Sequence, residues 1–234
     1  MVNLAYDHHL PTAAELPHSD ETPVDNELQN DIPNFLLNLL RLIWVDRQDW
    51  YFGVDMGIYH DPNRKTPIVP DGFLSLGVER QKGESGRLSY VLWEEDYKMP
   101  ILVLEVVSQT YNGEYDTKLQ AYQALGVLYY VVYNPLSGRR GVYKQRQSLE
   151  VYKLSSGEYQ LQQGVPMVWL PEIGLGLGCD RRTSGGWLRE WVYWYNEQGD
   201  RYQTTEELML QERQEKERLA TYLRSLGINP EEIP

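Results

Sequence analysis

The chain has 234 residues, with 22 Lys and Arg against 34 Asp and Glu, and its formal net charge is −12. An acidic protein has no general electrostatic attraction to nucleic acid, so binding to DNA or RNA would need a local basic patch or divalent ions. The single cysteine, Cys179, excludes an intramolecular disulfide, and no apolar segment approaches the length of a membrane span. The N-terminus also lacks the pattern of a secretory signal, so we expect a soluble, cytoplasmic protein.

The first hundred residues predict one amphipathic helix and two strands. The helix is indicated by apolar residues at helical spacing, namely Phe35, Leu36, Leu39, Leu40 and Ile43. The expected elements are an irregular lead-in over 1–24, a helix over about 26–45, a strand over 51–59, a turn at Pro70-Asp71-Gly72 that leads into a second strand, and a polar loop or hairpin over 79–98.

The segment Ile101–Ser108 is an apolar run with one carboxylate, Glu105, in its middle. A short β-branched run of this kind predicts a strand that is covered on both faces. Burial of an ionised carboxylate is costly unless a metal or a cation neutralises it. We therefore expect Glu105 to have a function.

A strand–helix–strand unit follows from this segment. Residues 112–125 predict a helix, which Gly126 ends at a position where a left-handed residue is common, and residues 127–133 form another fully apolar strand. This spacing predicts a βαβ unit with parallel strands and a right-handed crossover.

Beyond Pro135 the pattern changes to short strands. The expected elements are antiparallel strands at 141–143, 149–153 and 159–162, an aromatic-rich strand over 187–195, and a charged helix from Thr204 or Thr205 to about Leu226. Glu207 is placed to form a capping box with Thr204. The residues between Leu210 and Leu219 are polar or charged, which argues against a long coiled coil, so we expect this helix to dock by its end, for example on a partner subunit.

Three side chains of this arrangement can converge on one point. Asp71 precedes a strand, Glu105 lies inside the next, and Lys118 shares the apolar face of the following helix with Tyr115 and Tyr122. Two carboxylates on adjacent strands form a hard-oxygen site suited to Mg²⁺ or Mn²⁺. Such an ion polarises a phosphodiester and lowers the pKa of a bound water, and a nearby ammonium stabilises the charge that develops on the phosphate.

At this point the chain resembles the Uma-two family of restriction-endonuclease-like proteins, within the PD-(D/E)XK nuclease superfamily. The resemblance extends over about residues 15–180. It is carried by four ordered motifs: Val69-Pro-Asp71, Leu104-Glu-Val-Val-Ser108, Asp116-Thr-Lys118-Leu-Gln-Ala-Tyr122 and Gly126-Val-Leu-Tyr-Tyr-Val-Val-Tyr-Asn-Pro135. The resemblance implies a mixed α/β fold with a central mixed sheet flanked by helices, here over residues 25–185. Residues 186–234 would be an extension with the aromatic strand and the C-terminal helix. Nucleases of this superfamily are often dimers, so the resemblance also implies a homodimer.

The resemblance also implies roles for individual residues. Asp71 and Glu105 would bind Mg²⁺ or Mn²⁺ with the help of the Val106 carbonyl. The family motif expects a lysine two residues after the glutamate, but position 107 is Val, and the family often supplies the lysine from the next helix, which here is Lys118. A further carboxylate could come from Glu27 or Glu15.

Each of these residues also has a structural interpretation. Pro70-Asp71-Gly72 is a common turn, and Glu105 could be a buried ion-pair partner retained for structure. Lys118 lies four residues after Glu114, in the order that favours a surface ion pair.

Two other groups of residues could contact nucleic acid. The basic cluster Arg139-Arg140, Lys144 and Arg146 would be a solvated hairpin or a contact to the phosphate backbone. The aromatic residues between Trp187 and Tyr195 would pack in the core or stack on bases.

The leading hypothesis is an endonuclease that hydrolyses DNA phosphodiesters through a Mg²⁺-activated water, with Asp71, Glu105 and Lys118 as catalytic residues. The alternative is a catalytically inactive nuclease fold that serves as a binding or regulatory module, which the missing lysine at position 107 and the negative net charge both favour. A carboxylate-pair glycosidase is a weaker possibility, because nothing in the sequence supplies a sugar platform beyond scattered aromatic residues.

Overall fold

The computed structural model describes residues 10–17, 26–139 and 141–229. Its centre is a six-stranded mixed sheet in the order β1-β3-β5-β6-β7-β8. These strands are β1 (Trp50–Val54), β3 (Gly72–Leu76), β5 (Leu102–Val106), β6 (Tyr129–Tyr133), β7 (Leu149–Ser155) and β8 (Glu158–Leu161). The parallel pair is β5 with β6, and the other neighbours in this sheet are antiparallel. The predicted mixed sheet is therefore confirmed.

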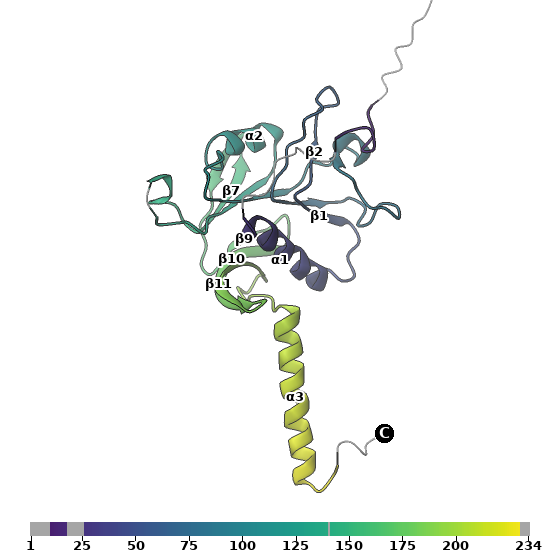
Figure 1. Cartoon of the computed structure of the whole chain (residues 1–234), viewed down its shortest axis with the longest axis vertical. Helices are drawn as coiled ribbons and strands as arrows, with labels where there is room; N and C mark the ends of the chain where they lie inside the picture. The colour runs from purple at the N-terminus through teal and green to yellow at the C-terminus, as the bar shows by residue number, and fades with distance from the viewer. Residues whose placement is uncertain (1–9, 18–25, 140, 230–234) are drawn as a thin grey trace, which may run out of the picture.

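The helix α2 (Thr117–Leu125) joins the two parallel strands and covers one face of the sheet, as Figure 1 shows. The predicted βαβ unit is thus confirmed, and Gly126 adopts the expected left-handed conformation at φ 76°. The helix is shorter than predicted. It begins at Thr117, where the Asp116 carboxylate caps the Thr117 N–H, and the preceding residues form turns.

The other face of the sheet is covered by α1 (Leu28–Ile43) and by a second, three-stranded antiparallel sheet. That sheet consists of β9 (Val168–Leu170), β10 (Leu175–Ser184) and β11 (Trp187–Tyr195). Because β5 alternates, Leu102, Leu104 and Val106 pack on the α1 side, whereas Val103 packs on the α2 side. Glu105 therefore falls on the α2 face.

Two predicted strands differ from the structure. The strand predicted over 51–59 is split into β1 and β2 (Ile58–Tyr59) at Asp55, whose φ of 47° is incompatible with an extended strand, and β2 pairs in parallel with β4 (Tyr90–Val91). The prediction of a strand at 141–143 is wrong. These residues form a 3-10 turn in which the Lys144 N–H donates to the Gly141 carbonyl, because Gly141 has a φ of 74°.

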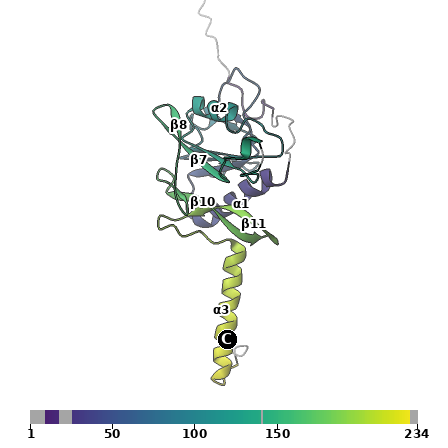
Figure 2. The same cartoon turned by 90° about the vertical axis from the view of Figure 1, so that its left-hand side faces the viewer.

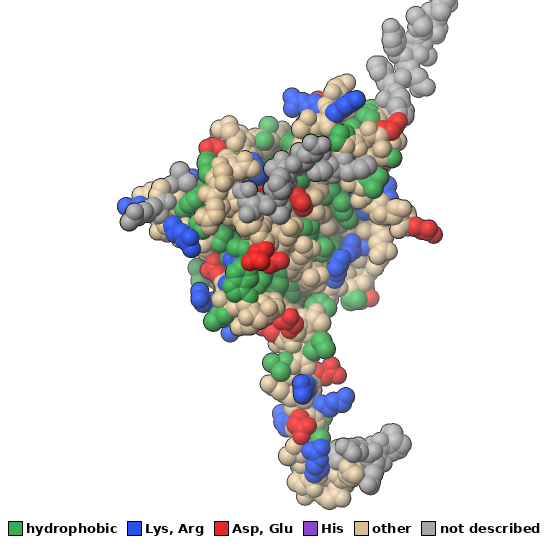
Figure 3. Space-filling view, viewed as in Figure 1, with side chains coloured by type: hydrophobic (Ala, Val, Ile, Leu, Met, Phe, Trp, Pro, Cys, Tyr) green, Lys and Arg blue, Asp and Glu red, His purple; other side chains and the backbone are tan. Residues whose placement is uncertain are grey.

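The C-terminal helix α3 (Thr205–Ser225) projects away from the rest of the molecule, as two perpendicular views show (Figures 1 and 2). Its predicted capping box between Thr204 and Glu207 is confirmed, and Arg201 forms an ion pair with Glu207. None of its residues is buried, and acidic, basic and hydrophobic side chains are mixed along it (Figure 3). The predicted docking of this helix on a partner subunit stays a prediction. No helix in the described part of the chain has the length and apolar character needed to span a membrane.

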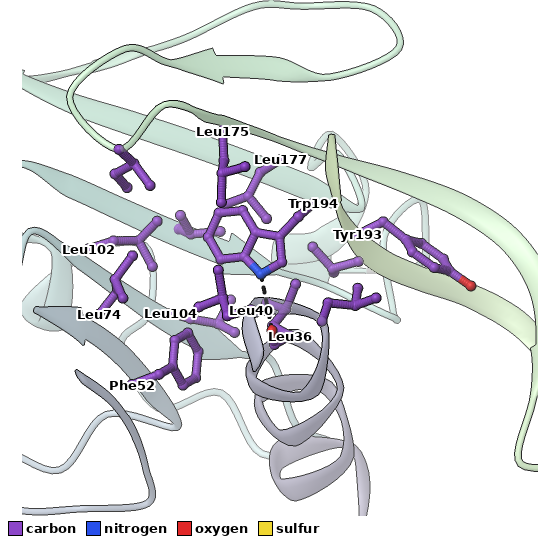
Figure 4. Packing of buried hydrophobic residues seen from close by; sticks show 14 of the residues in the cluster. Leu36, Leu40, Phe52, Leu74, Leu102, Leu104, Leu175, Leu177, Tyr193 and Trp194 are labelled. Carbon is purple, nitrogen blue, oxygen red and sulfur yellow. Dashed lines mark hydrogen bonds between the residues drawn. The ribbon is translucent and has the colours of Figure 1, made fainter. Parts of the chain in front are cut away.

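Trp194 joins the two sheets and α1. Its indole is fully buried between Leu175 and Leu177 of β10 and Leu36 and Leu40 of α1 (Figure 4). The indole N–H donates to the Leu36 carbonyl at 3.1 Å. The Trp194 side chain therefore fills the space between the two sheets, and its one polar atom is hydrogen-bonded.

We expect Trp194→Ala to lower the free energy of unfolding by about 3–5 kcal/mol, because it leaves a cavity in the centre of this layer. Trp187→Ala is the matched control. That indole is 42% exposed, so its loss should cost about 1 kcal/mol or less. Urea unfolding of both variants measures the difference, and equal losses would contradict the central role of Trp194.

Candidate active site

Glu105 is the buried carboxylate at the centre of the candidate site. Its side chain is 1% exposed, and both of its oxygens accept hydrogen bonds from α2. Lys118 Nζ lies 2.8 Å from Oε2, and the Tyr122 hydroxyl lies 2.7 Å from Oε1. Residues four apart lie on one helical face, so the crossover helix presents the ammonium and the phenol to the same carboxylate.

Asp71 lies immediately before β3, where the antiparallel register of Gly72 with Leu104 places it across from Glu105. One carboxylate oxygen accepts the Val106 N–H at 2.6 Å, and the other accepts the Gln29 side-chain amide at 3.3 Å. The contact with Gln29 requires α1 to approach the start of β3 closely. Gly72 permits this approach, because a Cβ there would lie 3.1 Å from the Pro33 Cβ.

The site contains two carboxyl groups and one ammonium. Burial raises the pKa of Asp71, and the neighbouring Glu105 carboxylate raises it further, to about 8. Burial also raises the pKa of Glu105, although Lys118 and Tyr122 oppose this shift. For Lys118, burial acts to lower the pKa, but the Glu105 carboxylate outweighs it and the pKa is raised. Near neutral pH the metal-free site therefore holds the Glu105–Lys118 ion pair beside a largely protonated Asp71.

The structure brings together the three residues that the sequence singled out. Lys118 forms its ion pair with Glu105 at 2.8 Å, and the alternative surface pair with Glu114 is not among the ion pairs of the described residues. Glu114 is instead buried, and its carboxylate accepts the Asn112 N–H. The catalytic roles of the three residues stay predictions.

Position 107 is not available for a catalytic lysine. Val107 is fully buried in the apolar cluster on the α2 side of the sheet. The other predicted carboxylates lie elsewhere. Glu15 bonds the Thr12 hydroxyl and N–H, and Glu27 precedes α1 on the wall of a separate cavity.

The two carboxylates fit a hard divalent cation better than a softer one. No cluster of three or more His, Cys, Asp or Glu side chains that could hold a metal exists within the described ranges. Mg²⁺ is commonly held by only one or two carboxylates and keeps several waters, so Asp71 and Glu105 suffice as protein side chains. The Val106 N–H is used to orient Asp71, and the Val106 carbonyl stays a predicted ligand.

Sequence reasoning missed two residues of the site. Tyr122 was placed on the same helical face as Lys118, and this spacing was the signal that could have identified it. Gln29 had no such signal. It is 42 positions from Asp71, and only the packing of α1 on β3 brings the two together.

We expect the buried Asp71 carboxylate to destabilise the metal-free protein at high pH. Because its pKa is about 8 in the folded state and near 3.8 when exposed, folding favours the protonated form, and this contribution is lost as the pH rises through 8. In EDTA, wild type should therefore lose stability relative to Asp71→Asn between about pH 4 and 8. Thermal unfolding across this range tests the expectation, and a constant difference between the two proteins would refute it.

The comparisons with known proteins agree with this architecture. Residues 19–182 match the model of the Uma2 family, which is described as "Putative restriction endonuclease". No curated protein and no solved structure matches the chain. The matched region covers more than half of the 234 residues and contains α1, the six-stranded sheet and the candidate site. The chain therefore belongs to the Uma2 family, as its motifs predicted, and this membership supports a nuclease-like function.

Proposed function

We propose that the chain is a metal-dependent endonuclease that hydrolyses phosphodiester bonds in DNA, with Mg²⁺ or Mn²⁺ held by Asp71 and Glu105. The observation that carries the proposal is the pair of buried carboxylates on adjacent strands with a single ammonium to compensate them. A divalent cation would compensate the negative charge that Asp71 acquires when it loses its proton. Membership of the Uma2 family supports the nuclease-like part of the proposal.

Each side chain has a distinct task in this proposal. Asp71 is oriented by the Val106 N–H and the Gln29 amide, and Glu105 by the Tyr122 hydroxyl, so both carboxylates are held before any ligand arrives. When bound, the cation would polarise the phosphodiester and lower the pKa of a coordinated water. Lys118 is placed to orient the attacking water or to stabilise negative charge on the phosphate oxygens.

One observation favours the alternative of an inactive binding module. Both oxygens of Glu105 are already hydrogen-bonded, to Lys118 and to Tyr122. In this alternative the ion pair is structural and the carboxylates do not bind a metal. Cleavage and metal binding therefore need separate measurements.

Purified protein should nick supercoiled plasmid DNA in the presence of Mg²⁺ or Mn²⁺, and Glu105→Gln should reduce the rate about 100-fold or more, because it removes a metal ligand. Glu172→Gln is a matched control. Glu172 accepts the same pair of donors, a tyrosine hydroxyl from Tyr129 and the ammonium of Lys153, but it lies outside the site. Unchanged cleavage by the Glu105 variant would refute the assignment, and a parallel assay on RNA tests the choice of DNA.

Calorimetric titration with Mn²⁺ should show binding to wild type that Asp71→Asn weakens. Lys118→Met should bind Mn²⁺ at least as tightly as wild type, because it removes a positive charge that repels the cation. Its cleavage rate should fall about 100-fold. Absence of Mn²⁺ binding by the folded wild-type protein would favour the binding module over the nuclease.

A further inference from the structure

A cavity of about 300 Å³ lies beside the candidate site. Its wall includes Val107 and Ser108, which follow Glu105 and Val106 directly along the chain, and Leu28, whose neighbour Gln29 contacts Asp71. The cavity is thus at the same edge of the sheet as the two carboxylates. In α/β sheets, ligands commonly bind outside the carboxyl ends of the parallel strands, which is where β5 and β6 end here.

Two arginines, Arg139 and Arg189, and one tryptophan, Trp187, also line this cavity. Arg189 is held in place because its Nη2 donates to the Tyr133 hydroxyl at 2.9 Å and its Nε donates to the Glu190 carbonyl at 2.9 Å. Its Nη1 is buried and has no hydrogen-bond partner within the described part of the chain. The guanidinium therefore places a fixed positive charge on the wall of the cavity, which favours an anionic ligand.

Trp187 provides an aromatic surface at the tip of the β10–β11 hairpin. The two-residue turn Gly185-Gly186, with φ of 56° and 78°, places it directly opposite Ser184. Its indole packs edge-on against Trp191 and lies 4.8 Å from the Arg189 guanidinium, yet it remains 42% exposed. The ring is therefore fixed in orientation and still accessible to a ligand.

We propose that this cavity binds one nucleotide of a single-stranded nucleic-acid segment next to the bond to be cleaved. Arg189 and the exposed Arg139 would contact its phosphate, and Trp187 would stack on its base. A base that is paired within a duplex has no free face for Trp187, so the cavity favours unpaired strands. This inference rests on the proposed nuclease function for its class of ligand.

The volume and charge of the cavity define the ligand further. About 300 Å³ lies at the lower end of the range of small-molecule sites, which suits a single nucleotide rather than a duplex. Glu27 also lines the cavity, and its carboxylate repels a phosphate. Removal of the Glu27 carboxylate should therefore strengthen the binding of a phosphate. The same change would weaken the binding of a positively charged ligand.

The test is the fluorescence anisotropy of a labelled DNA single strand of about 12 nucleotides, titrated with the full chain in EDTA so that no cleavage occurs. The same sequence in a hairpin duplex is the comparison. We expect the single strand to bind about tenfold more tightly than the duplex, and Trp187→Ala and Arg189→Gln each to weaken its binding about tenfold. Trp187→Phe should retain most of the affinity, and Glu27→Gln should increase it.

Matched controls come from α3, which is remote from the cavity. Tyr222→Ala removes an exposed aromatic ring and Arg213→Gln removes an exposed charge, and neither should change the affinity. If Arg189→Gln unfolds the protein, Arg139→Gln on the exposed loop takes its place. The proposal would be overturned if Trp187→Ala bound the single strand as tightly as wild type does, or if wild type preferred the hairpin duplex. It would also be overturned if wild type bound neither the single strand nor the duplex.

These outcomes are separable from those of the nuclease proposal. Binding that depends on Trp187 in a protein that never cleaves DNA would remove the catalytic assignment and leave the cavity. Cleavage of DNA by wild type, together with unchanged binding of the single strand by Trp187→Ala, would keep the catalytic assignment and remove the cavity proposal.

Discussion

The interaction on which the site depends is the hydrogen-bonded group of Glu105, Lys118 and Tyr122. Glu105 lies in a strand that is buried on both faces, and it falls on the face that the crossover helix covers. A carboxylate there is tolerated because α2 brings an ammonium and a phenol to its two oxygens. The βαβ connection therefore both closes the fold and completes the site.

The layers on the other face of the sheet position Asp71, the second carboxyl group of the site. Helix α1 packs on the strands through its apolar face and delivers Gln29 to Asp71. The β10–β11 hairpin covers α1, and Trp194 links the two through its contact with Leu36. The same hairpin carries Trp187 and Arg189 to the edge of the sheet, so the elements that complete the core also form one wall of the neighbouring cavity.

The charges near the site differ from the charge of the chain as a whole. The chain as a whole is acidic, which gives no general attraction to nucleic acid. Within the site, burial and then the neighbouring Glu105 carboxylate raise the pKa of Asp71 to about 8, so Asp71 would lose its proton most readily beside a bound cation. Arg139 and Arg189 line the neighbouring cavity, so these basic side chains lie beside the carboxyl groups rather than among them. In the proposed function, a metal ion and a phosphate would occupy adjacent places.

Several features follow from the sequence by itself because they depend on local periodicity. The βαβ unit, the left-handed Gly126, the capping box of α3 and the convergence of Asp71, Glu105 and Lys118 could all be predicted from strand and helix spacing. The family was likewise indicated by ordered short motifs, and its match confirms that prediction.

Tertiary packing decided the rest. The contact of Gln29 with Asp71 and the place of Arg189 beside the cavity have no local signal. Each depends on how separate layers approach one another, which side-chain volume and close backbone contact at residues such as Gly72 determine. A one-dimensional pattern shows which face of an element is apolar, but not which distant polar group that face will meet.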